Sequence, residues 1–198
     1  MTKINQAGAV AYALAQLRDK LSPKLVYHNL WHTQYDVLPG SVQLARQSGV
    51  SETELELVMV AAAFHDVGFT EGYSDHELIG CRMVTAVLPE FGFSTQQIEQ
   101  VVGMIMATRL PQSPRNLLEA IIADADLSLL GRSDFLTHNL CLRQELANYG
   151  RPTDSELWYT SQLAFLQNHA YFTAVAQSLY NEQKQRNIEK VMEMVRGG

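Results

Sequence analysis

The sequence predicts an all-α protein of about eight or nine helices, and two observations lead to this fold class. No segment alternates β-branched and polar residues between turn signals in the way that strands do. Apolar residues instead recur at helical spacing, and capping signals recur where helices should begin. We expect a single domain over residues 1–198, because a chain of this length with 46% apolar and 18% charged residues can bury one core.

Local signals place the helices along the chain. Patterns that fit a capping box begin at Ser51, Ser94 and Thr153. Ser113 followed by Pro114 fits an N-cap with proline at the first helical position. Pro39 should kink or split the second helix, because proline lacks the N–H that continues the ladder. The predicted helices span residues 4–20, 29–48, 51–66, 75–91, 95–108, 115–130, 132–148, 154–180 and 182–196.

The predicted helix over residues 51–66 is apolar on nearly every face. A helix that is hydrophobic all round is usually buried at the centre of its domain. This helix nevertheless ends in His65 and Asp66, two polar residues that burial would penalise unless a partner satisfies them. The sequence therefore predicts that a central helix carries an imidazole and a carboxylate into the interior.

Composition excludes several classes of protein. The net charge of −6 and the pI of about 5.5 argue against a nucleic-acid polymer or an anionic membrane as partner. The longest apolar runs, Ala7–Ala15 and Leu57–Phe64, are far shorter than the roughly 20 residues of a membrane-spanning helix. Cys81 and Cys141 each lie inside a predicted helix without CxxC spacing, as expected in a reducing compartment. We read the N-terminal segment as an amphipathic helix rather than a signal peptide and expect a cytoplasmic protein.

Three polar clusters border apolar helices and supply metal-binding side chains. His28 and His32 are four residues apart and would share one face of a helix. His65 and Asp66 are adjacent, so both reach one ion only at a helix end, which Gly68 supplies. The third cluster is the Asp-Ala-Asp segment at residues 124–126. Imidazole and carboxylate donors together suit Mn, Fe, Co, Ni or Zn and, less well, Mg.

The order of these residues resembles the H…HD…D signature of the HD-domain superfamily of metal-dependent phosphohydrolases. The matching segments are YHNLWHTQYDV at 27–37, AAAFHDVGF at 61–69 and DADLSLLGR at 124–132. The resemblance covers residues 27–132, about half of the chain, and is closest to the small bacterial branch of predicted HD-superfamily phosphohydrolases. It implies a helical bundle of the HD-domain type, with the helices of residues 132–196 packed on the core. It also implies one divalent metal, whose identity stays open among Mn, Co, Ni, Fe, Zn and Mg, held by His32, His65, Asp66 and Asp126.

The resemblance also implies a reaction, the hydrolysis of a phosphate ester of a nucleotide or related small metabolite. A bound metal lowers the pKa of its water and screens the phosphoryl charge. We expect Asp66, a ligand close to that water, to orient or deprotonate it. The alternatives are a cyclic-nucleotide phosphodiesterase and, from another class, a non-catalytic metal- and nucleotide-binding regulatory module. The oligomeric state stays open.

His28 is the candidate general acid. The pattern His-Asn-x-x-His-x-x-x-Asp-Val that begins at His28 resembles the first metal motif of mammalian-type cyclic nucleotide phosphodiesterases. The segment Asp126–Ser128 resembles their last motif, and in that family the histidine that matches His28 protonates the leaving oxygen. Their purine-selecting glutamine has no counterpart that we can place, so the acid role transfers more readily than the substrate. Capping of the helix and simple surface exposure are the alternatives for His28.

Two further residues are candidates for substrate binding. Arg109 closes the helix over 95–108 and could bind a phosphate bidentately, or could simply be a charge favoured at a helix C-terminus. His76 could support a metal ligand, contact the phosphate or cap its own helix. It is the sole histidine between the His65–Asp66 pair and Asp126, so we expect one metal rather than the bridged pair of the dinuclear oxygenases, although a second metal near His76 stays open.

The remaining candidates have structural interpretations. His138 and His169 lie on helices beyond the last motif and should be structural, and Arg132 should lie at the surface. The aromatic pairs at 158–159 and 171–172 should belong to the core rather than stack on a base.

Overall fold

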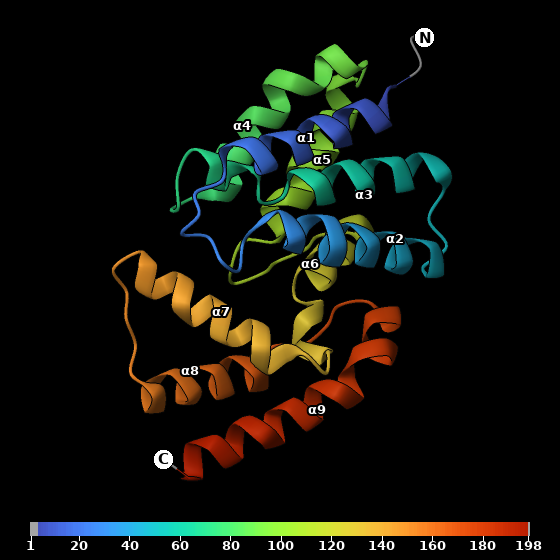
Figure 1. The fold of residues 1–198 in the computed structure, drawn as a ribbon. Coiled ribbons are helices and arrows are strands. Elements are labelled where there is room, and N and C mark those ends of the chain that lie inside the picture. Colours follow the sequence, from blue (N-terminus) through green and yellow to red (C-terminus); the bar gives the residue numbers. More distant parts are fainter. Residues whose placement is uncertain (1–3, 198) are drawn as a thin grey trace. The chain divides into compact units, whose positions relative to one another are not determined.

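The computed structural model describes residues 4–197, and this part of the chain forms nine α-helices and no strand (Figure 1). The all-α prediction is confirmed. None of these helices has both the length and the apolar character that crossing a bilayer requires. The α-helices are α1 (Gln6–Lys20), α2 (Leu38–Gln47), α3 (Glu52–Phe64), α4 (His76–Val87), α5 (Thr95–Ala107), α6 (Leu117–Asp126), α7 (Phe135–Asn148), α8 (Ser155–Asn168) and α9 (Ala174–Gly197). Short helical segments are η1 (His32–Val37), η2 (Val67–Thr70), η3 (Leu88–Phe91) and η4 (Ser128–Gly131).

The chain divides into two compact units. The first contains the chain up to Ser22 together with His28–Asp126, and the second contains Pro23–Tyr27 together with the chain from Leu127 onward. All residues of the predicted metal site belong to the first unit. The expectation that residues 132–196 pack on the core of a single domain stays a prediction.

Helix α3 is the centre of the first unit, as its sequence predicts. It packs against α1, α2, α5 and α6, and Figure 1 shows α1 and α2 on either side of it. Its start is also as predicted, because the Ser51 side chain accepts from the Glu54 amide while the Glu54 carboxylate accepts from the Ser51 amide. Helix α5 begins with the same reciprocal bonds between Ser94 and Gln97. The buried side chains of α3 include Leu55, Leu57, Val58, Val60, Ala61, Ala62, Ala63 and Phe64.

The second predicted helix is interrupted before Pro39. The segment η1 is a π-helix, with a wider turn than an α-helix, and α2 follows it with Pro39 in its first turn. Proline cannot donate to a carbonyl one turn earlier, and its ring crowds that turn. The predicted irregularity therefore takes the form of a widened turn that contains His32.

Two predicted helix starts are shifted by one or two residues. Asp154 rather than Thr153 caps α8, and its carboxylate accepts from the amide of Leu157. The helix predicted over 115–130 begins at Leu117 and follows Asn116, whose side chain accepts from the amide of Glu119. In both cases the asparagine or aspartate nearest the helix replaces the hydroxyl residue that the sequence pattern favoured.

The predicted division of the C-terminal helices is wrong. The helix predicted over 154–180 ends at Asn168, and α9 runs without a break from Ala174 through the segment predicted as a separate helix. His169 is extended, and its carbonyl accepts a hydrogen bond from the buried amine of Lys184 on α9. The Thr173 hydroxyl then caps α9 by accepting from the amide of Ala176.

The second unit has its own apolar core. Trp158 is buried in this unit as predicted, 3% exposed, and its indole N–H donates to the Asn139 side chain. Tyr171 is also buried, but Phe172 is 43% exposed, so its predicted core position is wrong. The two residues lie in the non-helical link between α8 and α9, so the helical spacing on which the prediction relied does not apply to them. The core cluster comprises Leu129, Leu130, Phe135, Leu166 and Val191.

Candidate metal centre

Four predicted ligands converge from three segments of the first unit. His65 follows the last residue of α3, Asp66 precedes η2, Asp126 ends α6, and His32 begins η1. Because α3 and α6 pack together and both end at this site, the partial negative charges of two helix C-termini favour a cation here. Burial of the apolar faces of α3 holds the helix in place, and this positions His65 and Asp66 at its C-terminal end.

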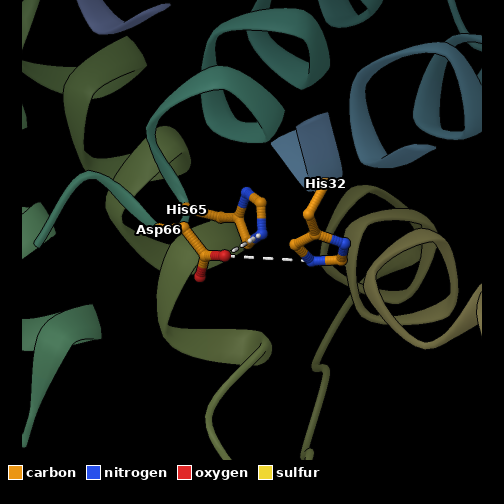
Figure 2. A group of neighbouring side chains, drawn as sticks. All are labelled: His32, His65 and Asp66. Carbon is orange, nitrogen blue, oxygen red and sulfur yellow. Dashed lines mark ion pairs between the residues drawn. The ribbon is translucent and has the colours of Figure 1, made fainter. Parts of the chain in front are cut away.

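Figure 2 shows the side chains of three of these residues, His32, His65 and Asp66, pointing toward one another. His32, His65 and Asp66 each place one potential ligand atom within 4.8 Å of the others. Oδ2 of Asp66 lies 3.2 Å from Nε2 of His65 and 3.8 Å from Nε2 of His32. Asp126 completes the cluster, since its Oδ1 lies 3.3 Å from Nε2 of His32 and 3.6 Å from Nε2 of His65.

The hydrogen bonds of His65 define which of its nitrogens is available. Its Nδ1 lies 2.8 Å from the carbonyl oxygen of Ala62, which can only accept, so Nδ1 carries the proton. In the neutral ring, Nε2 then presents a lone pair toward Oδ2 of Asp66. Both atoms are buried and have no hydrogen-bond partner. Two lone pairs that face each other at this distance require a cation between them.

Without a metal, a proton on His65 satisfies this requirement. Burial alone would lower the pKa of His65, but the carboxylates of Asp66 and Asp126 and the Ala62 carbonyl raise it to about 9. Burial would conversely raise the pKa of Asp66, but His65, His28 and His32 hold it well below its usual range. The site thus stabilises positive charge next to Asp66, which is the property that a divalent cation needs.

The arrangement around His32 also fits a metal ligand. The Nδ1 of His32 lies 3.9 Å from Oδ2 of Asp36, one turn later on η1. Histidines that bind metals commonly direct their second ring nitrogen toward a carboxylate, which fixes the ring and makes it a better donor. The donor set of two imidazoles and two carboxylates therefore fits a divalent metal.

His28 and His76 lie beside the cluster and share a contact with Phe69. The Phe69 ring stacks on His76 with centroids 3.9 Å apart and on His28 with centroids 4.7 Å apart. His28 is 6.0 Å from His32 between ring centroids, and Nε2 of His76 is 3.6 Å from Oδ1 of Asp66. The two oxygens of Asp66 therefore face different neighbours, one the candidate metal ligands and the other His76.

Comparisons with known proteins define the fold. No family model matches the chain, and no curated protein matches its sequence significantly. A predicted HD superfamily hydrolase from an uncultured Thermotogales bacterium is 16% identical, with a TM-score of 0.63 over 96% of this chain and 91% of that chain. Bacillus subtilis YpgQ, solved in complex with ADP, is 17% identical, with a TM-score of 0.65 over 96% of this chain and 97% of that chain. The chain has the HD-domain fold.

Within this HD-domain fold, Arg109 lies at the approach to His76. Its guanidinium donates to the Asp75 carboxylate at 2.8 Å, and both side chains are about half exposed. Asp75 precedes α4 in the left-handed conformation, with φ of 54°. Left-handed non-glycine residues are uncommon and often occur at functional sites. The phosphate-binding roles of Arg109 and His76 stay predictions.

Three other sequence candidates lie in the second unit. Arg132 and His138 both pair with Asp134, and His169 contacts the ring of Tyr171. These contacts account for the three side chains without a role at the candidate metal centre.

Sequence reasoning missed three neighbours of the site, although two of them left a signal. Asp36 belongs to the motif at residues 27–37 and lies four residues after His32, which is the spacing of helical neighbours. Phe69 is the last residue of the motif at residues 61–69. Glu77, whose carboxylate lies 3.6 Å from Nε2 of His76, is buried at the start of α4 and looks in the sequence like an ordinary first-turn acid.

Proposed function

We propose that the chain is a metal-dependent phosphohydrolase that cleaves a phosphate ester of a nucleotide or related small metabolite. The observation that carries the proposal is the pair of buried, unpartnered atoms, Nε2 of His65 and Oδ2 of Asp66, which face each other 3.2 Å apart. The ADP complex of YpgQ supports a nucleotide as the substrate class, because that protein shares the fold.

Each residue of the site has a task in this proposal. His32, His65, Asp66 and Asp126 hold the metal, which when bound supplies Lewis acidity toward water and phosphate. Asp66 also orients or deprotonates the attacking water. His28 protonates the leaving oxygen, a role that requires an imidazole within hydrogen-bond reach of it. Arg109 and His76 bind the phosphate, and for this Arg109 must exchange its bond to Asp75 for one to the substrate.

The test is phosphate release by metal-stripped protein that has been reloaded with Mn, Co, Ni, Zn or Mg. The panel contains nucleoside mono-, di- and triphosphates, guanosine tetraphosphate, and cyclic nucleotides scored by ring-opened product. Asp66→Ala should abolish turnover, whereas Asp19→Asn, an exposed carboxylate change on α1, should not. Ring opening without attack on monoesters would identify a cyclic-nucleotide phosphodiesterase. Tight metal binding without turnover on any substrate would favour a regulatory module, and failure to bind any metal would overturn the proposal.

A further inference from the structure

Two large aromatic side chains lie exposed on the segment that carries His32. Trp31 is 60% exposed and Tyr35 is 54% exposed, and their ring centroids are 4.4 Å apart with planes inclined at 42°. The described structure contains no hydrogen bond from the indole N–H or the phenolic O–H. An exposed tryptophan that packs on an exposed tyrosine is unusual enough on a protein surface to require an explanation.

The π-helical turn relates this pair to the metal centre. Residues four apart are neighbours on a helix surface, and here Trp31 contacts Tyr35 while His32 faces Asp36. Of the second pair, His32 is buried and Asp36 is partly buried. Trp31 directly precedes His32, so their Cα atoms are about 3.8 Å apart. π-helical turns are rare and are frequently found at functional sites.

We infer that Trp31 and Tyr35 form a stacking surface for the planar heterocyclic base of the substrate. The inference rests on the proposed function, in which the phosphate of the same molecule lies at the metal centre. Exposed aromatic rings bind bases by stacking and tolerate different bases, because every base has a π-face. The free indole N–H and phenolic O–H supply donors for the edge of the base or the sugar.

Size and charge favour this small planar ligand over larger partners. A stable protein interface buries more than about 1,000 Å² in total, far more than two aromatic side chains offer. Residues 28–40 contain no lysine or arginine, so this segment itself supplies no cation for the backbone of a nucleic-acid polymer or for anionic lipids. A single heterocycle matches the area of the pair.

Tryptophan fluorescence tests the inference independently of turnover. The chain has two tryptophans, and the second, Trp158, is buried in the other unit, so Trp158→Phe makes Trp31 the single reporter. Metal-loaded protein is titrated with AMP, GMP, CMP and UMP, and with ribose 5-phosphate as a ligand that lacks a base. We expect saturable quenching by at least one nucleotide and none by ribose 5-phosphate. Quenching that never saturates, or equal quenching by ribose 5-phosphate, would overturn the inference.

Calorimetry on ring variants supplies the second measurement. Trp31→Ala and Tyr35→Ala should each weaken nucleotide binding about tenfold, as expected for the loss of one stacking partner. Trp31→Phe and Tyr35→Phe keep a ring and should bind nearly as well, and the fluorescence titration still tests the inference if an alanine variant fails to fold. Leu117→Ala is the matched control, because Leu117 is an exposed apolar residue at the end of α6 opposite Asp126. Unchanged affinity in both alanine variants would refute the stacking surface.

The two proposals fail separately. Base-dependent quenching without phosphate release would retain the stacking surface and reject the hydrolase. Phosphate release from substrates that do not quench Trp31, with unchanged nucleotide affinity in both alanine variants, would retain the hydrolase and reject the stacking surface.

Discussion

Replacing one residue, His28, distinguishes a hydrolase from a non-catalytic metal-binding module. His28 contacts the ring of Phe69 and lies near His32, but it is not one of the four residues assigned to the metal. We expect His28→Ala to lower turnover by about 10² to 10⁴, the usual contribution of a general acid, with an unchanged metal content measured by atomic emission. His138→Ala, which removes a histidine of the second unit, should leave both quantities unchanged. Full activity in His28→Ala would remove His28 from the proposed mechanism.

Replacing Asp36 should change metal affinity, which replacing His28 should not, because Asp36 acts on the metal through His32. Its carboxylate faces Nδ1 of His32 at 3.9 Å, on the side of the ring away from Asp66 and Asp126. Asp36→Asn should weaken metal binding by about 10- to 100-fold, the range measured for such supporting carboxylates elsewhere. Competition against a chromophoric chelator measures this affinity. An unchanged dissociation constant would show that the orientation of His32 does not depend on Asp36.

Residues with a chemical signature could be predicted from the sequence, whereas their supporting neighbours could not. The polar end of the apolar helix α3 predicted that His65 and Asp66 need partners. The order of the motifs along the chain predicted that His32 and Asp126 are those partners. The contact of Phe69 with two histidines depends on how η2 turns after Asp66, which no local pattern encodes. For the same reason, the pairing of Arg109 with Asp75, 34 residues away, could not be predicted.

At the scale of elements, a close backbone contact positions α4 against η2. A Cβ atom added to Gly68 would lie 1.9 Å from the carbonyl oxygen of His76 and 2.9 Å from the amide nitrogen of Gly80. Any side chain at Gly68 must therefore push away the first turn of α4, which carries His76. Gly68 is thus important for close packing, whereas the prediction that it ends α3 is wrong, because α3 ends at Phe64 and Gly68 lies inside η2.

Gly68→Ala should destabilise the protein by about 1–3 kcal/mol or more, the cost of inserting a methyl group into a packed contact. Thermal unfolding followed by circular dichroism measures the effect. Gly80→Ala is the matched control, because its added Cβ would meet its nearest atom, the Phe64 carbonyl oxygen, at 3.3 Å. That milder contact is offset by the higher helix propensity of alanine. Equal unfolding temperatures for the two variants would argue against a tight contact at Gly68.

Helix starts were easier to predict than helix ends, for a physical reason. The capping boxes at Ser51 and Ser94 are formed by residues three apart in sequence, so the pattern contains the whole interaction. The end of α8 is instead accompanied by a bond from Lys184, 15 residues further on, to the carbonyl of His169. The link between α8 and α9 therefore depends on a tertiary contact, and local periodicity predicted a continuous helix.

For the molecule as a whole, the candidate metal should contribute to stability through mass action. A ligand that binds only the folded state stabilises it by about 2.7 kcal/mol when its concentration is 100 times its dissociation constant. The predicted ligands all belong to the first unit, so the added stability belongs to the unfolding of that unit. Calorimetric scans should show an unfolding temperature that rises with metal concentration in the wild type and stays constant in Asp66→Ala. A metal-dependent rise in Asp66→Ala would place the binding elsewhere.

The stability of the second unit should instead depend on pH through His169. Both ring nitrogens of His169 are buried without a hydrogen-bond partner, and the ring contacts Phe165 and Tyr171. Burial, with a smaller effect of the Lys184 ammonium, lowers the pKa of His169 to about 4, whereas an unfolded histidine titrates near 6.5. Between these values the unfolded chain binds the extra proton, so this contribution to stability is full above about pH 6.5 and is lost as the pH falls toward 4.

Replacing His169 by phenylalanine should remove this pH dependence, because phenylalanine takes up no proton. The unfolding temperatures of the wild type and His169→Phe, measured at intervals from pH 7 to pH 4, should diverge progressively on acidification, with the wild type losing more. Other groups titrate in the same range, among them the carboxylates of the first unit, but they are common to both proteins and cancel in the difference. Parallel curves would mean that the imidazole of His169 reaches solvent in the folded protein, so that burial does not control its protonation.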